Sequence, residues 1–216
     1  MTRPLRDVWA DTLIQLAPGN PDLLVLDGDL ATSTRADRFA NAYPDRFLQM
    51  GIAEQGMVGT AVGLAQMGFV PWLSSFTVFF THRAVDQIRM SVAQTHANVK
   101  IGAAYAGLQT GFTGKTHLDV QDLAIMRAMP GMTVLAPADA SECAAMVRWA
   151  TATPGPVFLR LGRDGGPDLF AADEGIGQVT GRLSLRGEML TIEMDASSRR
   201  LSVSATGRMA TTPSTR

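Results

Sequence analysis

Residues 50–76, MGIAEQGMVGTAVGLAQMGFVPWLSSF, decide the fold of this chain. The longer stretch 55–81 contains no Asp, Glu, Lys or Arg, and its length alone would allow a transmembrane helix. Gly68 and Pro71 interrupt it, however, and separate a helix-like half from a strand-like half. This pattern predicts a buried helix followed by a buried parallel strand, and not a membrane span.

The same alternation continues on both sides of this stretch. Helical periodicity is expected at 5–16, 34–42, 53–67, 77–94, 118–128 and 140–151, and short apolar strands at 22–27, 46–49, 69–74, 99–104, 132–136 and 156–161. Strands that alternate with helices through short connections are typical of an α/β fold. We therefore expect a doubly wound parallel sheet with helices on both faces.

The character of the sequence changes near residue 170. Residues 175–216 contain no aromatic residue and show weak periodicity, although 183–193 and 201–204 could form short strands. We expect one domain at 1–170 and an atypical, partly disordered tail at 171–216.

Composition limits the class of protein. The 216 residues are 46% hydrophobic and 18% charged, with a formal net charge of −1. Such a balance argues against a nucleic-acid partner or a membrane-surface protein. Cys143 is the only cysteine, its neighbours are apolar, and the N-terminus lacks an apolar signal segment. We expect a cytoplasmic protein in which Cys143 is a buried structural thiol.

Glu54 is the most informative residue, because it is a single carboxylate at the start of the uncharged stretch. A buried lone carboxylate is costly unless a partner compensates it, so this position is a functional candidate. The alternative is a solvent-facing residue in the first turn of a helix, where the helix dipole favours an acid.

Other candidates follow the strands of the predicted sheet. In doubly wound sheets, ligands bind beyond the carboxyl ends of the strands. The chain places five features there: Asp29, Glu54, Phe76, the glycine-rich loop 105–117 and Arg163.

Several of these features have structural alternatives. Phe76, Phe79 and Phe80 could be core residues or the wall of a pocket for a flat heterocycle. His117 could be structural or catalytic. Gly114-Lys115-Thr116 does not form a phosphate-binding P-loop, because Gln109 stands where that pattern needs a glycine. The three histidines have no zinc-site spacing.

Gly56, Gly59 and Gly63 lie on one predicted helix together with Ala53 and Thr60. Glycine in a helix costs up to about 1 kcal/mol relative to alanine. We expect the glycines to permit close approach of another helix, on a face that is buried in a larger assembly.

Taken together, several motifs resemble the pyrimidine-binding domain of transketolases, and in particular the C-terminal subunit of split (two-chain) bacterial transketolases. The resemblance covers about residues 3–168. The motifs that carry it are Met50-Gly-Ile-Ala-Glu-Gln55, Phe69-Val-Pro-Trp72, Ser75-Phe-Thr-Val-Phe-Phe80, Arg83-Ala-Val-Asp-Gln-Ile-Arg89, Gly114-Lys-Thr-His117 and Asp122-Leu-Ala-Ile-Met-Arg-Ala-Met-Pro-Gly-Met-Thr-Val-Leu-Ala-Pro-Ala-Asp139.

The resemblance implies a thiamine diphosphate enzyme. Glu54 matches the glutamate that hydrogen-bonds N1′ of the aminopyrimidine and thereby assists formation of the cofactor ylide. Phe76 and Phe79 match aromatic residues that pack on the pyrimidine. His82 stands where transketolases usually have another aromatic residue, and Asp29 matches an acid near the pyrimidine side of the site.

The resemblance also implies a substrate site. His117 matches a substrate-contacting, catalytic histidine, and Arg3, Ser33 and Arg163 match positions that bind the sugar phosphate. The donor-binding loop differs from the usual pattern: Thr113 replaces an acid, Tyr105 replaces a histidine, and Lys115 adds a cation. These departures favour a modified or otherwise anionic ketose as the donor.

The family's Gly-Asp-Gly…Asn motif for the diphosphate and Mg²⁺ is not found in this sequence. A partner subunit with the thiamine-diphosphate domain, in a heterotetramer, is therefore implied. We also expect the C-terminal domain of transketolases to be absent from this chain. The expected activity is transfer of a two-carbon ketol unit from a ketose to an aldehyde. The alternatives are a thiamine-dependent carboligase of a specialised pathway and a non-catalytic stabilising subunit.

Overall fold

The computed structural model describes residues 3–167, so the tail expected at 171–216 lies outside the described residues. Six parallel strands form one sheet in the order β2-β1-β3-β4-β6-β5. They are β1 (Leu23–Asp27), β2 (Phe47–Gln49), β3 (Val70–Phe76), β4 (Lys100–Ala104), β5 (Thr133–Leu135) and β6 (Val157–Arg160). The order reverses at β1 and β3, as expected for a doubly wound sheet, and this is where such sheets bind ligands.

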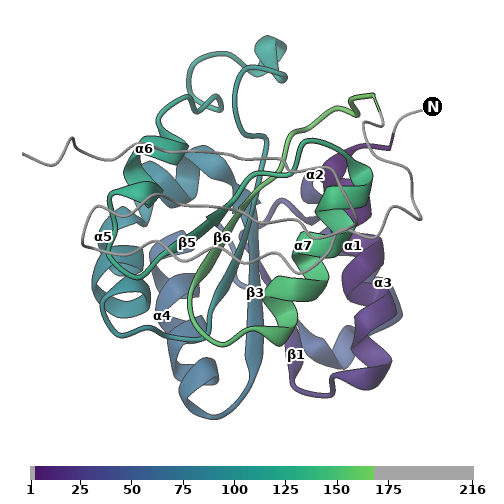
Figure 1. Cartoon of the computed structure of the whole chain (residues 1–216), viewed down its shortest axis with the longest axis vertical. Helices are drawn as coiled ribbons and strands as arrows, with labels where there is room; N and C mark the ends of the chain where they lie inside the picture. Colours follow the sequence, from purple (N-terminus) through teal and green to yellow (C-terminus); the bar gives the residue numbers. More distant parts are fainter. Residues whose placement is uncertain (1–2, 168–216) are drawn as a thin grey trace, which may run out of the picture.

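Helices cover both faces of the sheet (Figure 1). The α-helices are α1 (Leu5–Leu16), α2 (Ala31–Thr34), α3 (Ala36–Ala42), α4 (Glu54–Gln66), α5 (Val85–Gln87), α6 (Asp122–Arg127) and α7 (Ala140–Ala152). α1, α3 and α7 pack on one face over a core that includes Trp9 and Trp72, whose rings meet edge to face at 6.2 Å. α4, α5 and α6 cover the other face, over a second core around Met57 and Phe80.

The uncharged stretch forms α4 and then β3, so the predicted order of a helix and a buried parallel strand is confirmed. The helix itself is buried on one side only, because four of its thirteen residues are buried. β3 pairs with β1 on one side and with β4 on the other, and six of its seven residues are buried. No helix among residues 3–167 is long and apolar enough to cross a membrane. Cys143 is buried in the first core, as expected, and burial raises the pKa of its thiol.

Two predicted helices are broken. The segment expected as one helix at 34–42 is split by Arg35, whose backbone is left-handed at φ 72°. The segment expected at 77–94 contains two π-helical turns, Phe79–Arg83 (η3) and Ile88–Ala93 (η4), on either side of α5. π-helical turns are rare and concentrate at functional sites.

The glycines of α4 have no close neighbour inside the chain. Gly56, Gly59 and Gly63 are exposed, and a Cβ added at any of them would meet nothing within 4 Å. Their helix is closely packed only on its other side, through Met57, Val58 and Ala61. Nothing among residues 3–167 packs on the glycines, so the expectation of a face buried in an assembly stays a prediction.

Lys100 is fully buried at the start of β4, at the end of the sheet opposite to the carboxyl ends of the strands. Its Nζ donates hydrogen bonds to the carbonyl oxygens of Thr153 at 2.6 Å and Gly155 at 2.5 Å. Burial lowers the pKa of Lys100 to about 7. A neutral amine keeps enough N–H donors for both carbonyl groups.

Replacing Lys100 with methionine should change how stability depends on pH. A lysine has a pKa of about 10.4 when unfolded, so between about pH 7 and pH 10 the unfolded chain binds more protons than the folded chain. The wild type should therefore gain up to about 1.4 kcal/mol of unfolding free energy per pH unit over this range, relative to Lys100→Met. Urea unfolding at several pH values measures the unfolding free energy of each protein. Lys115→Met is the control, because Lys115 is exposed. Parallel curves for wild type and Lys100→Met would contradict the assignment.

Candidate functional site

Glu54 begins α4, at the carboxyl edge of the sheet, and is completely buried. Its Oε1 accepts a hydrogen bond from Ser75 Oγ at 3.1 Å, near the end of β3. Gly28, directly after β1, leaves room for this carboxylate, because a Cβ there would lie 3.2 Å from Ser75 Oγ and 3.5 Å from Glu54 Oε1. The alternative of a solvent-facing first-turn residue is therefore wrong.

The cation that compensates Glu54 is Arg83. Its Nη1 donates to Glu54 Oε2 at 2.7 Å. The guanidinium also lies over the ring of Phe79, with Cζ 4.2 Å from the ring centroid. An opposite charge with a hydrogen bond offsets much of the cost of burying a carboxylate. Arg83 lies two residues past the uncharged stretch, inside the segment expected as a plain helix.

A cavity of about 340 Å³ opens beside this ion pair, and we call it the Glu54 cavity. It lies at the carboxyl edge of the sheet, beyond β1 and β3. Asp29, from the loop after β1, contributes to its wall with a left-handed backbone at φ 66°. Strained conformations of this kind cluster at functional sites. The lining residues are Gly28, Asp29, Leu30, Ile52, Glu54, Phe79, Arg83, Thr116 and His117.

A row of rings leads away from the cavity. The His117 ring meets Phe79 edge to face at 5.5 Å and Phe76 at 5.9 Å. Phe76 in turn stacks on Tyr105, with centroids 3.9 Å apart. His117 Nδ1 is 2.8 Å from Thr116 Oγ1. The sequence-predicted residues Phe76, Phe79, His117 and Tyr105 thus form one continuous cluster of rings, in which Phe79 and His117 line the cavity while Phe76 and Tyr105 are buried.

Arginines gather at the far end of the row. Arg6 Nη1 donates to Tyr105 Oη and to the carbonyl oxygen of Ser33, both at 2.7 Å. Arg163 lies on the same ring, with Cζ 5.7 Å from the Tyr105 centroid, and Arg6 Cζ is at 5.3 Å. Arg6 is 8% exposed, its Nε has no hydrogen-bond partner, and none of the ion pairs among residues 3–167 includes it. A buried cation with an unused donor is suited to bind an anion.

Four other expected site residues lie apart from these groups. Arg3 forms an ion pair with Asp11, and both side chains lie toward the solvent. His82 faces Asp119, with Nε2 3.7 Å from Oδ1, and does not line the Glu54 cavity. Thr113 Oγ1 donates to the carbonyl oxygen of Thr110 at 2.8 Å, within its own loop. Lys115 is exposed on that loop.

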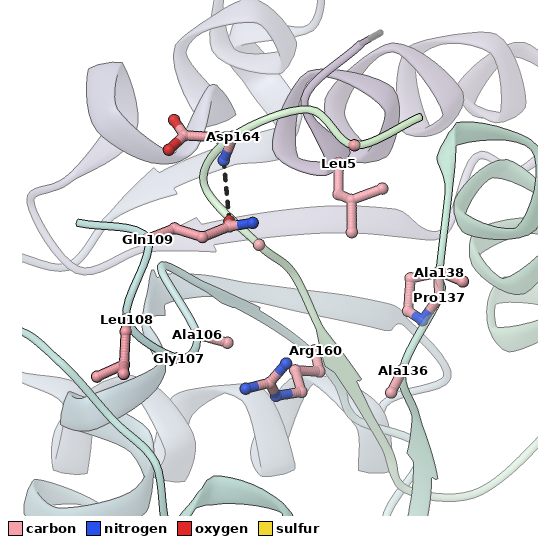
Figure 2. Close-up of a pocket in the computed structure, with 12 residues that line it drawn as sticks. Leu5, Ala106, Gly107, Leu108, Gln109, Ala136, Pro137, Ala138, Arg160 and Asp164 are labelled. Carbon is pink, nitrogen blue, oxygen red and sulfur yellow. Dashed lines mark hydrogen bonds between the residues drawn. The ribbon is translucent and has the colours of Figure 1, made fainter. Parts of the chain in front are cut away.

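A second cavity, of about 300 Å³, lies beyond the ends of β4, β5 and β6 (Figure 2). Gln109 on one side accepts a hydrogen bond from the backbone N–H of Asp164 at 3.1 Å. Arg160 is neutralised by an ion pair, because its Nε donates to the carboxylate of the buried Asp122 at 2.5 Å. This cavity has no unpaired charge and no aromatic wall among its lining residues, so the Glu54 cavity is the better candidate.

The Glu54 cavity fits a flat, nitrogen-containing heterocycle. Glu54 can form a hydrogen bond with a ring nitrogen, and Phe79 offers a ring face for stacking. No group of three or more His, Cys, Asp or Glu side chains that could hold a metal ion occurs among residues 3–167.

Comparison with known proteins identifies the family of the domain. The family profile described as "Transketolase, pyrimidine binding domain" matches residues 2–167. The 6-deoxy-6-sulfo-D-fructose transketolase subunit of a Clostridium species is 39% identical over 157 residues, which are 73% of this chain and 49% of that protein. An apulose-4-phosphate transketolase subunit of Phocaeicola vulgatus is 33% identical over 169 residues, 78% of this chain and 54% of that protein. The chain thus spans about half the length of these relatives.

A solved structure described as "Split gene transketolase, inactive beta4 tetramer" has the same fold. It matches with a TM-score of 0.72 and 39% identity, over 89% of this chain and 60% of that chain. The expected doubly wound α/β fold is confirmed by this match and by the sheet order. The family profile covers all of the residues that the structure describes, and the chain belongs to the transketolase pyrimidine-binding domain family.

Proposed function

We propose that this chain is the pyrimidine-domain subunit of a thiamine diphosphate-dependent transketolase-like enzyme, which transfers a two-carbon ketol unit from an anionic ketose to an aldehyde. The observation that carries the proposal is the completely buried carboxylate of Glu54 beside the Phe79 ring, in a cavity of about 340 Å³. This combination of a buried carboxylate and an aromatic face fits the aminopyrimidine of thiamine.

Each side chain has a defined task in this proposal. Glu54 hydrogen-bonds the ring nitrogen of the aminopyrimidine and holds or releases a proton there, while Phe79 and Phe76 orient the ring and exclude water. When bound, thiamine diphosphate supplies the nucleophilic carbon that attacks the ketose carbonyl. His117 contacts both phenylalanine rings, so it is positioned to hold or donate a proton at the substrate's oxygen atoms.

The anionic end of the donor would bind at the other end of the row of rings. Arg6 and Arg163 flank Tyr105 there, and Arg6 is the guanidinium without an acidic partner among residues 3–167, since Arg163 is paired with Asp164 at 2.8 Å. The names of two relatives support an anionic donor, since 6-deoxy-6-sulfo-D-fructose carries a sulfonate and apulose-4-phosphate a phosphate. We assign the anion-binding role to Arg6 in place of Arg3, because Arg3 is paired with Asp11.

A partner subunit would supply the binding site for the diphosphate and its Mg²⁺. Two relatives are named as transketolase subunits, and one similar structure is described as an inactive tetramer of β chains. These names support the need for a partner. A heterotetramer of two pyrimidine-domain and two diphosphate-domain chains would meet this need. The exposed apolar side chains Ile52, Leu108, Phe112 and Val120 belong to the segments that follow β2 and β4 at the carboxyl edge of the sheet, and they suit a covered surface.

A ketol-transfer assay tests the proposed reaction. The chain is mixed with the N-terminal transketolase section from the same organism, thiamine diphosphate and Mg²⁺, and is given a sulfonated, a phosphorylated or an uncharged ketose together with an aldehyde acceptor. We expect transfer only with both chains present, and a higher kcat/KM for the charged donors. Carboligation without ketol transfer, or no product from any donor, would reject the proposal.

A further inference from the structure

Arg83 contacts the same two groups that the proposed function gives to the aminopyrimidine. Its Nη1 is 2.7 Å from Glu54 Oε2, and its Cζ is 4.2 Å from the centroid of the Phe79 ring. Arg83 also lines the Glu54 cavity. A guanidinium group is planar and carries N–H donors, so it can stack on a ring and bind a carboxylate at the same time. In both respects it imitates the edge and face of an aminopyrimidine.

We propose that Arg83 is a placeholder, meaning a side chain that fills the aminopyrimidine site of the cofactor-free chain and leaves when the cofactor enters. This inference rests on the proposed function. A guanidinium and a heterocycle cannot occupy the same face of the Phe79 ring together. A heterocycle that stacks on this face therefore displaces the Arg83 guanidinium and breaks its ion pair with Glu54.

The structure explains why such a placeholder is useful. Glu54 is 0% exposed, and without a counter-charge its carboxylate would be costly to keep buried in the cofactor-free chain. Ser75 supplies one neutral hydrogen bond to Oε1, whereas Arg83 supplies the opposite charge at Oε2. The ion pair thus holds Glu54 in place until the heterocycle arrives.

The position of the Arg83 side chain also allows it to leave the cavity. Its side chain is 41% exposed, so the guanidinium has an open route from the cavity to the solvent. Its backbone, in contrast, is tied to α4, because Gln55 Nε2 donates to the Arg83 carbonyl oxygen at 2.9 Å. Arg83 is the last residue of η3, directly before the break at Ala84. A rotation about side-chain bonds alone can therefore clear the site.

The placeholder has a measurable consequence for affinity. When only a fraction of a protein is in the binding-competent state, the apparent dissociation constant is the intrinsic one divided by that fraction. If the cavity is clear in about one molecule in ten, removal of the guanidinium should strengthen cofactor binding about tenfold.

Calorimetric titration of the two-chain complex tests this. Thiamine diphosphate with Mg²⁺ is titrated into complexes that contain wild type, Arg83→Gln or the control Arg89→Gln. Arg89 is paired with Asp86 outside the Glu54 cavity, and its replacement removes the same charge. We expect Arg83→Gln to bind the cofactor about tenfold more tightly than wild type, and Arg89→Gln to match wild type. Thermal melts establish that both variants are folded.

The outcomes separate the two proposals. If wild type binds the cofactor and Arg83→Gln binds equally well or more weakly, Arg83 is no placeholder, although the proposed function stands. If no complex binds it, both proposals fail. Crystal structures of the wild-type complex without and with the cofactor give a second test that needs no variant. Arg83 should contact Glu54 only in the cofactor-free structure, and an ion pair that persists beside bound cofactor would overturn the inference.

Discussion

The Glu54→Gln enzyme should lose ketol transfer almost completely while it still assembles and binds thiamine diphosphate. Glutamine has nearly the same shape and keeps a hydrogen bond to the aminopyrimidine, but it cannot hold and release a proton. Since a positioned acid or base contributes roughly 10²–10⁴-fold to a rate, kcat should fall by about this factor. Steady-state kinetics of the reconstituted enzyme measure the change, and calorimetry checks that the cofactor still binds.

Glu142→Gln is the matched control for this variant. Glu142 is also buried, but it accepts a hydrogen bond from the backbone N–H of Ala138, just before α7, and does not line the Glu54 cavity. We expect its kcat to stay close to that of wild type. A Glu54→Gln enzyme with wild-type kcat would remove Glu54 from the catalytic site and reject the account.

The Arg6→Met enzyme should lose its preference for anionic donors. Arg6 is buried, has no acidic partner among residues 3–167 and reaches Tyr105 at the end of the row of rings. A hydrogen bond to a charged group contributes about 1.5–3 kcal/mol, so KM for a phosphorylated or sulfonated ketose should rise roughly 10- to 150-fold. Uncharged ketoses should be affected much less. Initial rates over a range of donor concentrations give KM and kcat separately.

Arg3→Met is the control, and it distinguishes the two arginines directly. The resemblance to transketolases assigns binding of the sugar phosphate to Arg3. In the structure, however, Arg3 forms an ion pair with Asp11 on the surface. We expect Arg3→Met to leave the KM for anionic donors within about twofold, as is usual for surface substitutions. If Arg3→Met raised KM for charged donors and Arg6→Met did not, the assignment of Arg6 would be wrong.

The sheet and much of the candidate site were predictable from the sequence. Parallel strands end at one edge of a sheet, so residues directly after them converge there whatever the details of packing. For this reason Asp29, Glu54 and the loop with His117 meet at one cavity, as the order of strands and polar loops indicates. The roles of these residues remain predictions until variants are tested.

The roles of Arg83 and Arg6 could not be predicted, because each depends on the direction of a side chain. Arg83 lies in a segment that reads as a regular helix, but Thr81 Oγ1 donates to the Thr77 carbonyl oxygen and the chain forms the π-helical turn η3. Such side-chain bonds compete with helical hydrogen bonds. Arg6 lies only three residues after Arg3, and sequence spacing does not show which of the two points toward β4. A useful signal was present, since a carboxylate that is buried in its ionised form is stabilised by a cation nearby.

Calorimetric titration of thiamine diphosphate and Mg²⁺ is the most direct test of the central claim that this chain completes a cofactor site with a partner. The cofactor is titrated into this chain alone, into the N-terminal transketolase section alone, and into their mixture. The account predicts tight binding only in the mixture, and its loss when Phe79→Ala replaces wild type. Equal binding by the N-terminal section alone, or no binding in the mixture, would contradict it.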